Sequence, residues 1–235
     1  ADAGATAQFW LRDDDAISNT SRLRQLADWA DRNETEILLA LVPSQADDTL
    51  QKMVETTPQF VGAVHGWAHQ NHAPASEKQQ ELGAHRQLHV LCAALSAALE
   101  RTEALCGDLA LPVLVPPWNR ISQDVVQVLP QLGFLGLSTF SEAFTSPAIP
   151  GLIVQNSHVD IIDWKGTRGG RPHGDLVKEA ADAAHLNTPA DQPVGILTHH
   201  LVHDEVAWSF LDKLGDIVRG HPGAAWVSPA SVFSA

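Results

Sequence analysis

Strand-length apolar runs alternate with helical patterns along almost all of the 235 residues, and this alternation constrains the fold more than any other feature. The runs cover residues 7–12, 36–42, 60–64, 111–115, 134–138, 152–163, 194–198 and 224–228. Most runs are predominantly apolar rather than alternating, which is typical of parallel strands that are covered on both faces. Helical patterns lie between them, over residues 21–33, 76–106, 122–134, 174–187 and 204–220.

Roughly seven such alternations favour a parallel α/β architecture. A closed or nearly closed barrel suits this length better than an open sheet. We therefore expect one domain over residues 1–235, a distorted (β/α)7-type barrel of parallel strands with outer helices. Barrels of this kind carry their functional groups at the C-terminal ends of the strands.

Charge and composition limit the partners. The formal net charge is −13, and an acidic surface repels phosphate backbones and anionic lipids, so we expect neither nucleic acid nor a membrane as partner. No run reaches the about 18 apolar residues of a membrane-spanning helix. The chain begins with ADAGATAQ, which has neither the basic nor the apolar region of a signal peptide. We expect a soluble protein, cytoplasmic rather than exported, with export and the oligomeric state left open.

Titratable and aromatic side chains collect at the ends of five runs, which should meet at one edge of the barrel. They are Asp13, Asp14 and Asp15 after the first run, His65, His69 and His72 after the third, Trp118, Asn119 and Arg120 after the fourth, Asp160, Asp163 and Trp164 at the sixth, and Thr198, His199, His200, His203 and Asp204 after the seventh.

Three adjacent aspartates repel one another unless something positive lies among them. His65 and His69 are four residues apart, so both imidazoles would lie on one face if HGWAHQ opens a helix. Paired histidines at this spacing bind zinc in helical motifs. One carboxylate and two imidazoles leave a position open for water, as in catalytic zinc sites. We therefore predict a divalent cation, a second aspartate that accepts the proton of the water, and His199 or His200 as proton donor.

These residues resemble the motifs of the polysaccharide deacetylase family, also called the NodB-homology domain or carbohydrate esterase family four. The resemblance runs from Leu11 to about Asp204, with LRDDDA, HGWAH, PPWNR, DIIDW and ILTHH in the family's order. It implies that Asp14 is the catalytic base and His199 the catalytic acid. It also implies that the metal ligands are Asp15, His65 and His69.

The resemblance further implies which residues border the substrate. They are Pro117, Trp118, Asp163, Trp164 and His200. A backbone amide near Trp118 would hold the oxyanion, Trp164 would wall the pocket, and an aspartate of DIIDW would tune the catalytic histidine.

Three positions depart from the family's pattern. Val115 stands where an arginine usually orients the catalytic base, and Arg12 and Arg120 are the candidates to replace it. Ala16 stands where a glycine usually follows the paired aspartates, and Gly66 replaces the usual serine or threonine after the first metal histidine. These changes indicate a divergent branch and leave the substrate more open than the metal site.

The sequence thus predicts a metal-dependent hydrolase of carbon–nitrogen (non-peptide) bonds that removes N- or O-linked acetyl groups from a carbohydrate. Two imidazole ligands favour Zn²⁺, although Co²⁺, Ni²⁺ and Mn²⁺ fit the same ligands. Two alternatives remain. One is an amidase acting on a non-sugar C–N bond. The other is an inactive barrel that binds metal or sugar, which the missing arginine favours.

Overall fold

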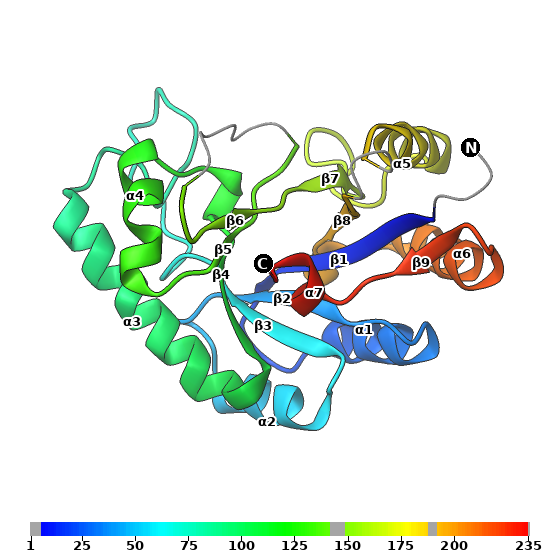
Figure 1. The fold of residues 1–235 in the computed structure, drawn as a ribbon, viewed down its shortest axis with the longest axis horizontal. Coiled ribbons are helices and arrows are strands. Elements are labelled where there is room, and N and C mark those ends of the chain that lie inside the picture. Colours follow the sequence, from blue (N-terminus) through cyan, green and yellow to red (C-terminus); the bar gives the residue numbers. More distant parts are fainter. Residues whose placement is uncertain (1–5, 142–148, 188–191, 235) are drawn as a thin grey trace.

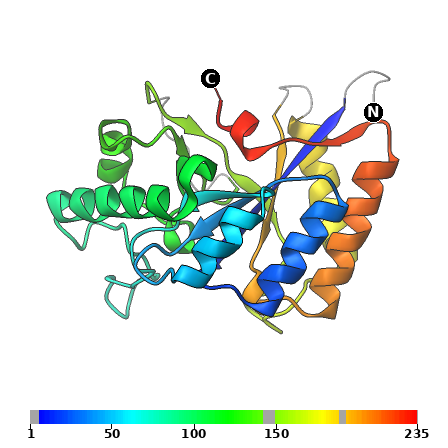
Figure 2. The same cartoon turned by 90° about the horizontal axis from the view of Figure 1, so that it is seen from below.

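A computed structural model describes residues 6–141, 149–187 and 192–234. In this part of the chain, nine parallel strands form one sheet in the order β6-β5-β4-β3-β2-β1-β8-β7, with β9 beside β1. The strands are β1 (Ala7–Ala16), β2 (Ile37–Leu41), β3 (Phe60–Val64), β4 (Ala110–Leu114), β5 (Gly136–Leu137), β6 (Ile153–Val154), β7 (Ser157–Asp160), β8 (Val194–Thr198) and β9 (Ala224–Trp226). The sheet curls, and the larger helices lie around its outer side (Figures 1 and 2). The predicted distorted α/β barrel is confirmed.

The helices are α1 (Ser21–Arg32), α2 (Asp48–Thr56), α3 (Leu88–Cys106), α4 (Gln123–Val128), α5 (His173–Asn187), α6 (Glu205–Gly220) and α7 (Pro229–Val232). Helix α1 begins where the Thr20 side chain accepts a hydrogen bond from the Leu23 N–H at 3.0 Å, which satisfies one of the free N–H groups of the first turn. None of the helices in the described ranges is long and apolar enough to cross a membrane.

The central strands bury both of their faces, because successive side chains point to opposite sides of the sheet. Leu11 and Leu39 lie on the outer face and pack in the same core as the residues that α1 and α6 bury. Trp10 and Leu38 lie on the inner face, inside the curl. There Phe233, just after α7, meets the ring of Trp10 edge-on at 5.7 Å. Apolar packing on both faces explains why these strands read as continuous apolar runs.

Two predicted elements differ from the structure. The helix expected over 76–106 begins only at Leu88, and residues 65–87 contain no helix or named strand. The run 152–163 divides into β6 and β7, which lie at opposite ends of the sheet order. A parallel bridge from Phe140 to Ser157 spans the remaining gap. The sequence FSEAFTSPAIPG over 140–151 also predicts a long loop, but residues 142–148 lie outside the described residues.

Candidate active site

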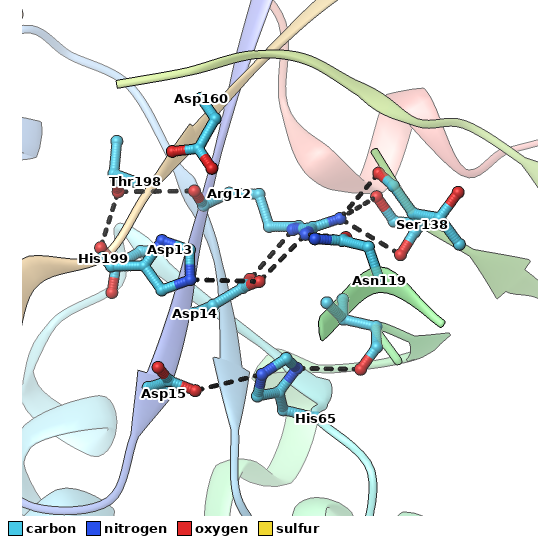
Figure 3. Close-up of polar contacts among 12 residues, drawn as sticks. Arg12, Asp13, Asp14, Asp15, His65, Asn119, Ser138, Asp160, Thr198 and His199 are labelled. Atoms are coloured by element: carbon cyan, nitrogen blue, oxygen red, sulfur yellow. Dashed lines mark hydrogen bonds and ion pairs between the residues drawn. The ribbon is translucent and has the colours of Figure 1, made fainter. Parts of the chain in front are cut away.

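The three consecutive aspartates at the end of β1 have three different surroundings (Figure 3). Asp13 and Asp14 belong to the strand, so their side chains point to opposite faces. Asp14 shares the inner face with Arg12, two residues earlier. Asp15 has a φ of +73°, which is uncommon for a residue with a side chain and ends the alternation. Its carboxylate lies beside His65 and His69.

Arg12 holds Asp14 through two parallel bonds. The Nε of Arg12 donates to Oδ1 of Asp14 and its Nη2 donates to Oδ2, both at 2.9 Å. The same guanidinium donates to the backbone oxygens of Ser138 and Thr139 and to Oδ1 of Asn119. Arg12 is fully buried and Asp14 is 2% exposed. A bidentate, fully hydrogen-bonded pair of this kind fixes the plane of the carboxylate.

Of the two arginines considered for this contact, Arg12 therefore makes it. Arg120 is partly buried and donates to the backbone oxygen of Gln79 instead. The position of Val115 is also informative, because its carbonyl oxygen lies 2.9 Å from Nδ1 of His65. In this chain, that position orients a histidine through its backbone rather than a carboxylate through its side chain.

Asp15, His65 and His69 form a group that could hold a metal ion, with one ligand atom from each lying within 4.8 Å of the others. Oδ1 of Asp15 lies 3.2 Å from Nε2 of His65 and 3.4 Å from Nε2 of His69. A carbonyl oxygen only accepts hydrogen bonds, so the contact with Val115 places the proton of a neutral His65 on Nδ1. The lone pair of Nε2 then faces the Asp15 carboxylate. Electron-rich atoms that converge in this way fit a divalent cation.

The pKa values of Asp15 and His65 point in the same direction, whereas burial and the charge of His65 lower the pKa of His69. Burial raises the pKa of Asp15, but the hydrogen bond and charge of His65 outweigh it and bring the pKa below its usual range. Burial lowers the pKa of His65, but the charges of Asp14 and Asp15 outweigh it and raise the pKa. The electrostatic field of the aspartates thus favours positive charge between these side chains.

The two histidines meet without a helix. Gly66 has a φ of +63° and His69 a φ of +53°, both in the left-handed region, so HGWAH forms a turn. The condition that HGWAHQ opens a helix is therefore not met, although both imidazoles still reach the same point. The indole of Trp118 lies 4.3 Å from the His69 ring and walls this side of the site. Pro117 is buried against the turn, and a Cβ added to Gly66 would touch the Pro117 ring.

His199 lies across from the candidate metal ligands, on the Asp14 side. Its Nε2 is 3.9 Å from Oδ2 of Asp14, and its side chain is 11% exposed. The indole of Trp164 meets the His199 ring edge-on at 4.7 Å. The Nε1 of Trp164 donates to Oδ2 of Asp160 at 2.8 Å. Burial raises the pKa of the Asp160 carboxyl, which the charge of His199 only partly offsets.

Two residues expected at the substrate lie elsewhere. The Asp163 carboxylate accepts from the backbone N–H groups of Gly166 and Thr167, so it stabilises a turn; Asp160 is the DIIDW aspartate near His199. His200 is 1% exposed, and its Nδ1 is paired with Asp13. His200 therefore supports the end of β1 from behind and is not available to a substrate.

Three features were not predicted from the sequence. They are the buried Glu81, which is described below, the contact of Asn119 with Arg12, and the role of Asp13. Asp13 is fully buried and accepts from the hydroxyl of Thr198 at 2.6 Å and from the backbone N–H of His200 at 2.8 Å. These bonds tie the end of β1 to the end of β8. Asp13 thus has a structural role, in holding the two strand ends together, rather than the role of a spare ligand.

Comparisons with known proteins bear on the fold. Neither a protein-family model nor a curated protein matches the sequence. Solved structures do match. A candidate polysaccharide deacetylase from Mycobacterium smegmatis gives a TM-score of 0.68 at 13% identity, with 98% of this chain and 90% of that chain covered. A family 4 carbohydrate esterase from Streptomyces lividans gives 0.57 at 12% identity, with 95% and 93% covered.

A family 4 acetyl xylan esterase from Clostridium thermocellum, solved with a cobalt ion, gives a TM-score of 0.57 at 14% identity, with 96% of this chain and 90% of that chain covered. The chain therefore has the fold of polysaccharide deacetylases and family 4 carbohydrate esterases over nearly its whole length.

Proposed function

We propose that the protein is a metal-dependent hydrolase that removes acetyl groups from a carbohydrate. The observation that carries the proposal is the convergence of Asp15, His65 and His69 beside a carboxylate, Asp14, that Arg12 holds in a fixed orientation. The fold supports it, because proteins that share this fold are described as deacetylases of polysaccharide or peptidoglycan and as acetyl xylan esterases.

Asp15, His65 and His69 would hold the cation, with zinc favoured by the two imidazoles. A bound divalent cation would supply Lewis acidity to the acetyl carbonyl and to the attacking water. Val115 fixes the tautomer of His65 and so keeps its Nε2 available as a ligand.

Asp14 would be the general base. Arg12 holds both oxygens of Asp14 and so fixes where the carboxylate accepts the proton of the attacking water. The immediate chain neighbour of Asp14, Asp15, would bind the metal, so base and ligand are placed by the same strand end. A base on a rigid strand end meets the geometric demand of proton transfer better than a base on a loop.

His199 would be the general acid, which donates a proton to the departing nitrogen or oxygen of the sugar. Trp164 packs against its ring, and Asp160 in turn accepts a hydrogen bond from Trp164, so these contacts restrict the positions that the imidazole can take. On the opposite wall, the backbone N–H of Trp118 would stabilise the oxyanion of the tetrahedral intermediate. Trp118 and Trp164 would then flank the acetylated sugar.

Acetate release tests the proposal. The purified protein is incubated with N- and O-acetylated oligosaccharides and with acetylated non-sugar amines, before and after chelation and after zinc is restored. We expect acetate from at least one sugar, loss after chelation, and recovery with zinc. Turnover of non-sugar amides alone would indicate an amidase. Bound metal without any turnover would indicate a binding protein, and either result would contradict the proposal.

A further inference from the structure

Glu81 is a buried carboxylate to which the chemistry above gives no role. Its side chain is 1% exposed. It accepts hydrogen bonds from three consecutive backbone N–H groups, at 3.3 Å from Trp67, 2.9 Å from Ala68 and 3.1 Å from His69. Successive N–H groups that converge in this way form an anion-binding concavity, and the chain fills it with its own side chain. One of the three donors belongs to a candidate metal ligand.

Glu81 also explains Gly66, which departs from the family's pattern. A Cβ on Gly66 would lie 2.2 Å from Oε2 of Glu81 and 2.7 Å from the Pro117 ring, and the φ of +63° disfavours a side chain as well. His69 has a left-handed φ of +53° despite its side chain, a conformation that is energetically costly for a residue other than glycine. The bonds to Glu81 offset that cost.

The chain segment that carries Glu81 is itself held in place. Leu82 is fully buried and forms a parallel bridge with Ile121. The backbone N–H of Ser122 donates to the carbonyl of Leu82 at 2.9 Å. Glu81 therefore links the turn that bears His65 and His69 to the segment that follows Trp118. The position of the His69 imidazole depends on this link, because the turn has no helix or strand of its own.

We propose that Glu81 is a positioning residue for the metal site, which fixes the backbone of Trp67–His69 so that the His69 imidazole meets Asp15 and His65. The inference rests on the proposed function in that it requires a metal at these ligands. Glu81 acts through backbone hydrogen bonds and does not itself reach the cation. Its negative charge, buried beside His69, adds to the preference for a cation there.

The test compares Glu81→Gln with Glu77→Gln. Glutamine keeps one acceptor oxygen but turns an amide donor toward the N–H groups, so the three bonds no longer all form. Glu77 lies in the same segment, with a side chain 51% exposed and paired with His85, and serves as the matched control. We expect zinc to bind Glu81→Gln about 10–100-fold more weakly than wild type, as for other residues that orient metal ligands, and Glu77→Gln to bind as wild type. Competition with a chromophoric chelator gives the dissociation constants.

The visible spectrum of the Co²⁺-loaded protein separates positioning from general stabilisation. We expect a changed Co²⁺ spectrum in Glu81→Gln and an unchanged one in Glu77→Gln, because only the first displaces a ligand. If Glu81→Gln does not fold by circular dichroism, Glu81→Asp, which keeps the charge on a shorter side chain, takes its place with weaker zinc binding expected.

Wild-type zinc affinity and an unchanged Co²⁺ spectrum in the folded Glu81 variant would overturn the inference alone. A wild-type protein that binds neither zinc nor cobalt would overturn the metal site itself, and this result is seen before any variant is measured.

Discussion

The candidate metal ligands come from two regions that are built differently. Asp15 extends from β1, where Leu11–Asp13 pair with β2 on one side and β8 on the other. His65 and His69 lie in the turn after β3, and the chain from there to Leu88 has no helix or named strand. The first region is held by a ladder of backbone bonds between buried strands. The second depends on a buried side chain, Glu81, and on its bridge to the Trp118 segment.

This difference predicts that the two regions contribute differently to the site. The β1 end places the proposed base, Asp14, and one ligand with the rigidity of the sheet. The turn places two ligands through bonds that one substitution can remove. We therefore expect changes at the β1 end to affect catalysis and stability, and changes in the turn to affect metal affinity.

The largest expected effect is on catalysis, at the β1 end. Asp14→Asn removes the proposed proton acceptor while leaving the three ligands in place, so acetate release should fall by about 10²–10⁴-fold. Zinc content should stay near that of wild type, as measured by elemental analysis of the same sample. Full turnover in the Asn variant would show that Asp14 is not the base.

The next effect is on stability. Arg12→Ala leaves the buried Asp14 carboxylate without its cation, and should lower the free energy of unfolding by about 3–5 kcal/mol. Arg120→Ala, which removes a partly buried arginine with one hydrogen bond to a backbone oxygen, should lower it by no more than about 1.5 kcal/mol. Denaturant unfolding of both variants measures the difference. Equal losses would mean that the buried pair does not anchor the β1 end.

The smallest effect concerns the response of the two regions to metal removal. Ligand-bound states are protected against local opening, so chelation should speed hydrogen exchange of the amides at 67–69 roughly tenfold. The amides at 11–13 should remain slower to exchange than those at 67–69 both with and without zinc, because their bonds lie in the sheet ladder. Equally fast exchange in both regions after chelation would contradict the difference in construction.

The fold could be predicted from the sequence because the pattern that determines it is local and recurs along the chain. Runs such as 37–41 and 60–64 are apolar throughout, as is typical of strands buried on both faces. The predicted start of α3, at residue 76 instead of Leu88, was wrong for the opposite reason. Residues 76–87 have a composition that suits a helix, but Glu81 and Leu82 form tertiary contacts that require a non-helical backbone. Such contacts leave no periodic pattern in the sequence.

The parts of the candidate site that lie at strand ends could be predicted from the sequence. The order of the motifs indicated Asp14, Asp15, His65, His69 and His199, which the structure brings together. Arg12 had a usable signal, because residues two apart on a strand share a face and Arg12 precedes Asp14 by two. Asp160, at the end of β7, was passed over for Asp163, whose position after the strand serves a turn. Glu81 had no sequence signal, because its partners are backbone groups.

The central claim is that Asp15, His65 and His69 together bind one divalent cation. Anomalous diffraction at the zinc absorption edge, from crystals grown with zinc, tests it most directly. We predict a single strong peak within ligand distance, about 2.0–2.2 Å, of a carboxylate oxygen of Asp15 and of Nε2 of both histidines. No peak among these three side chains, with zinc present in excess, would contradict the account.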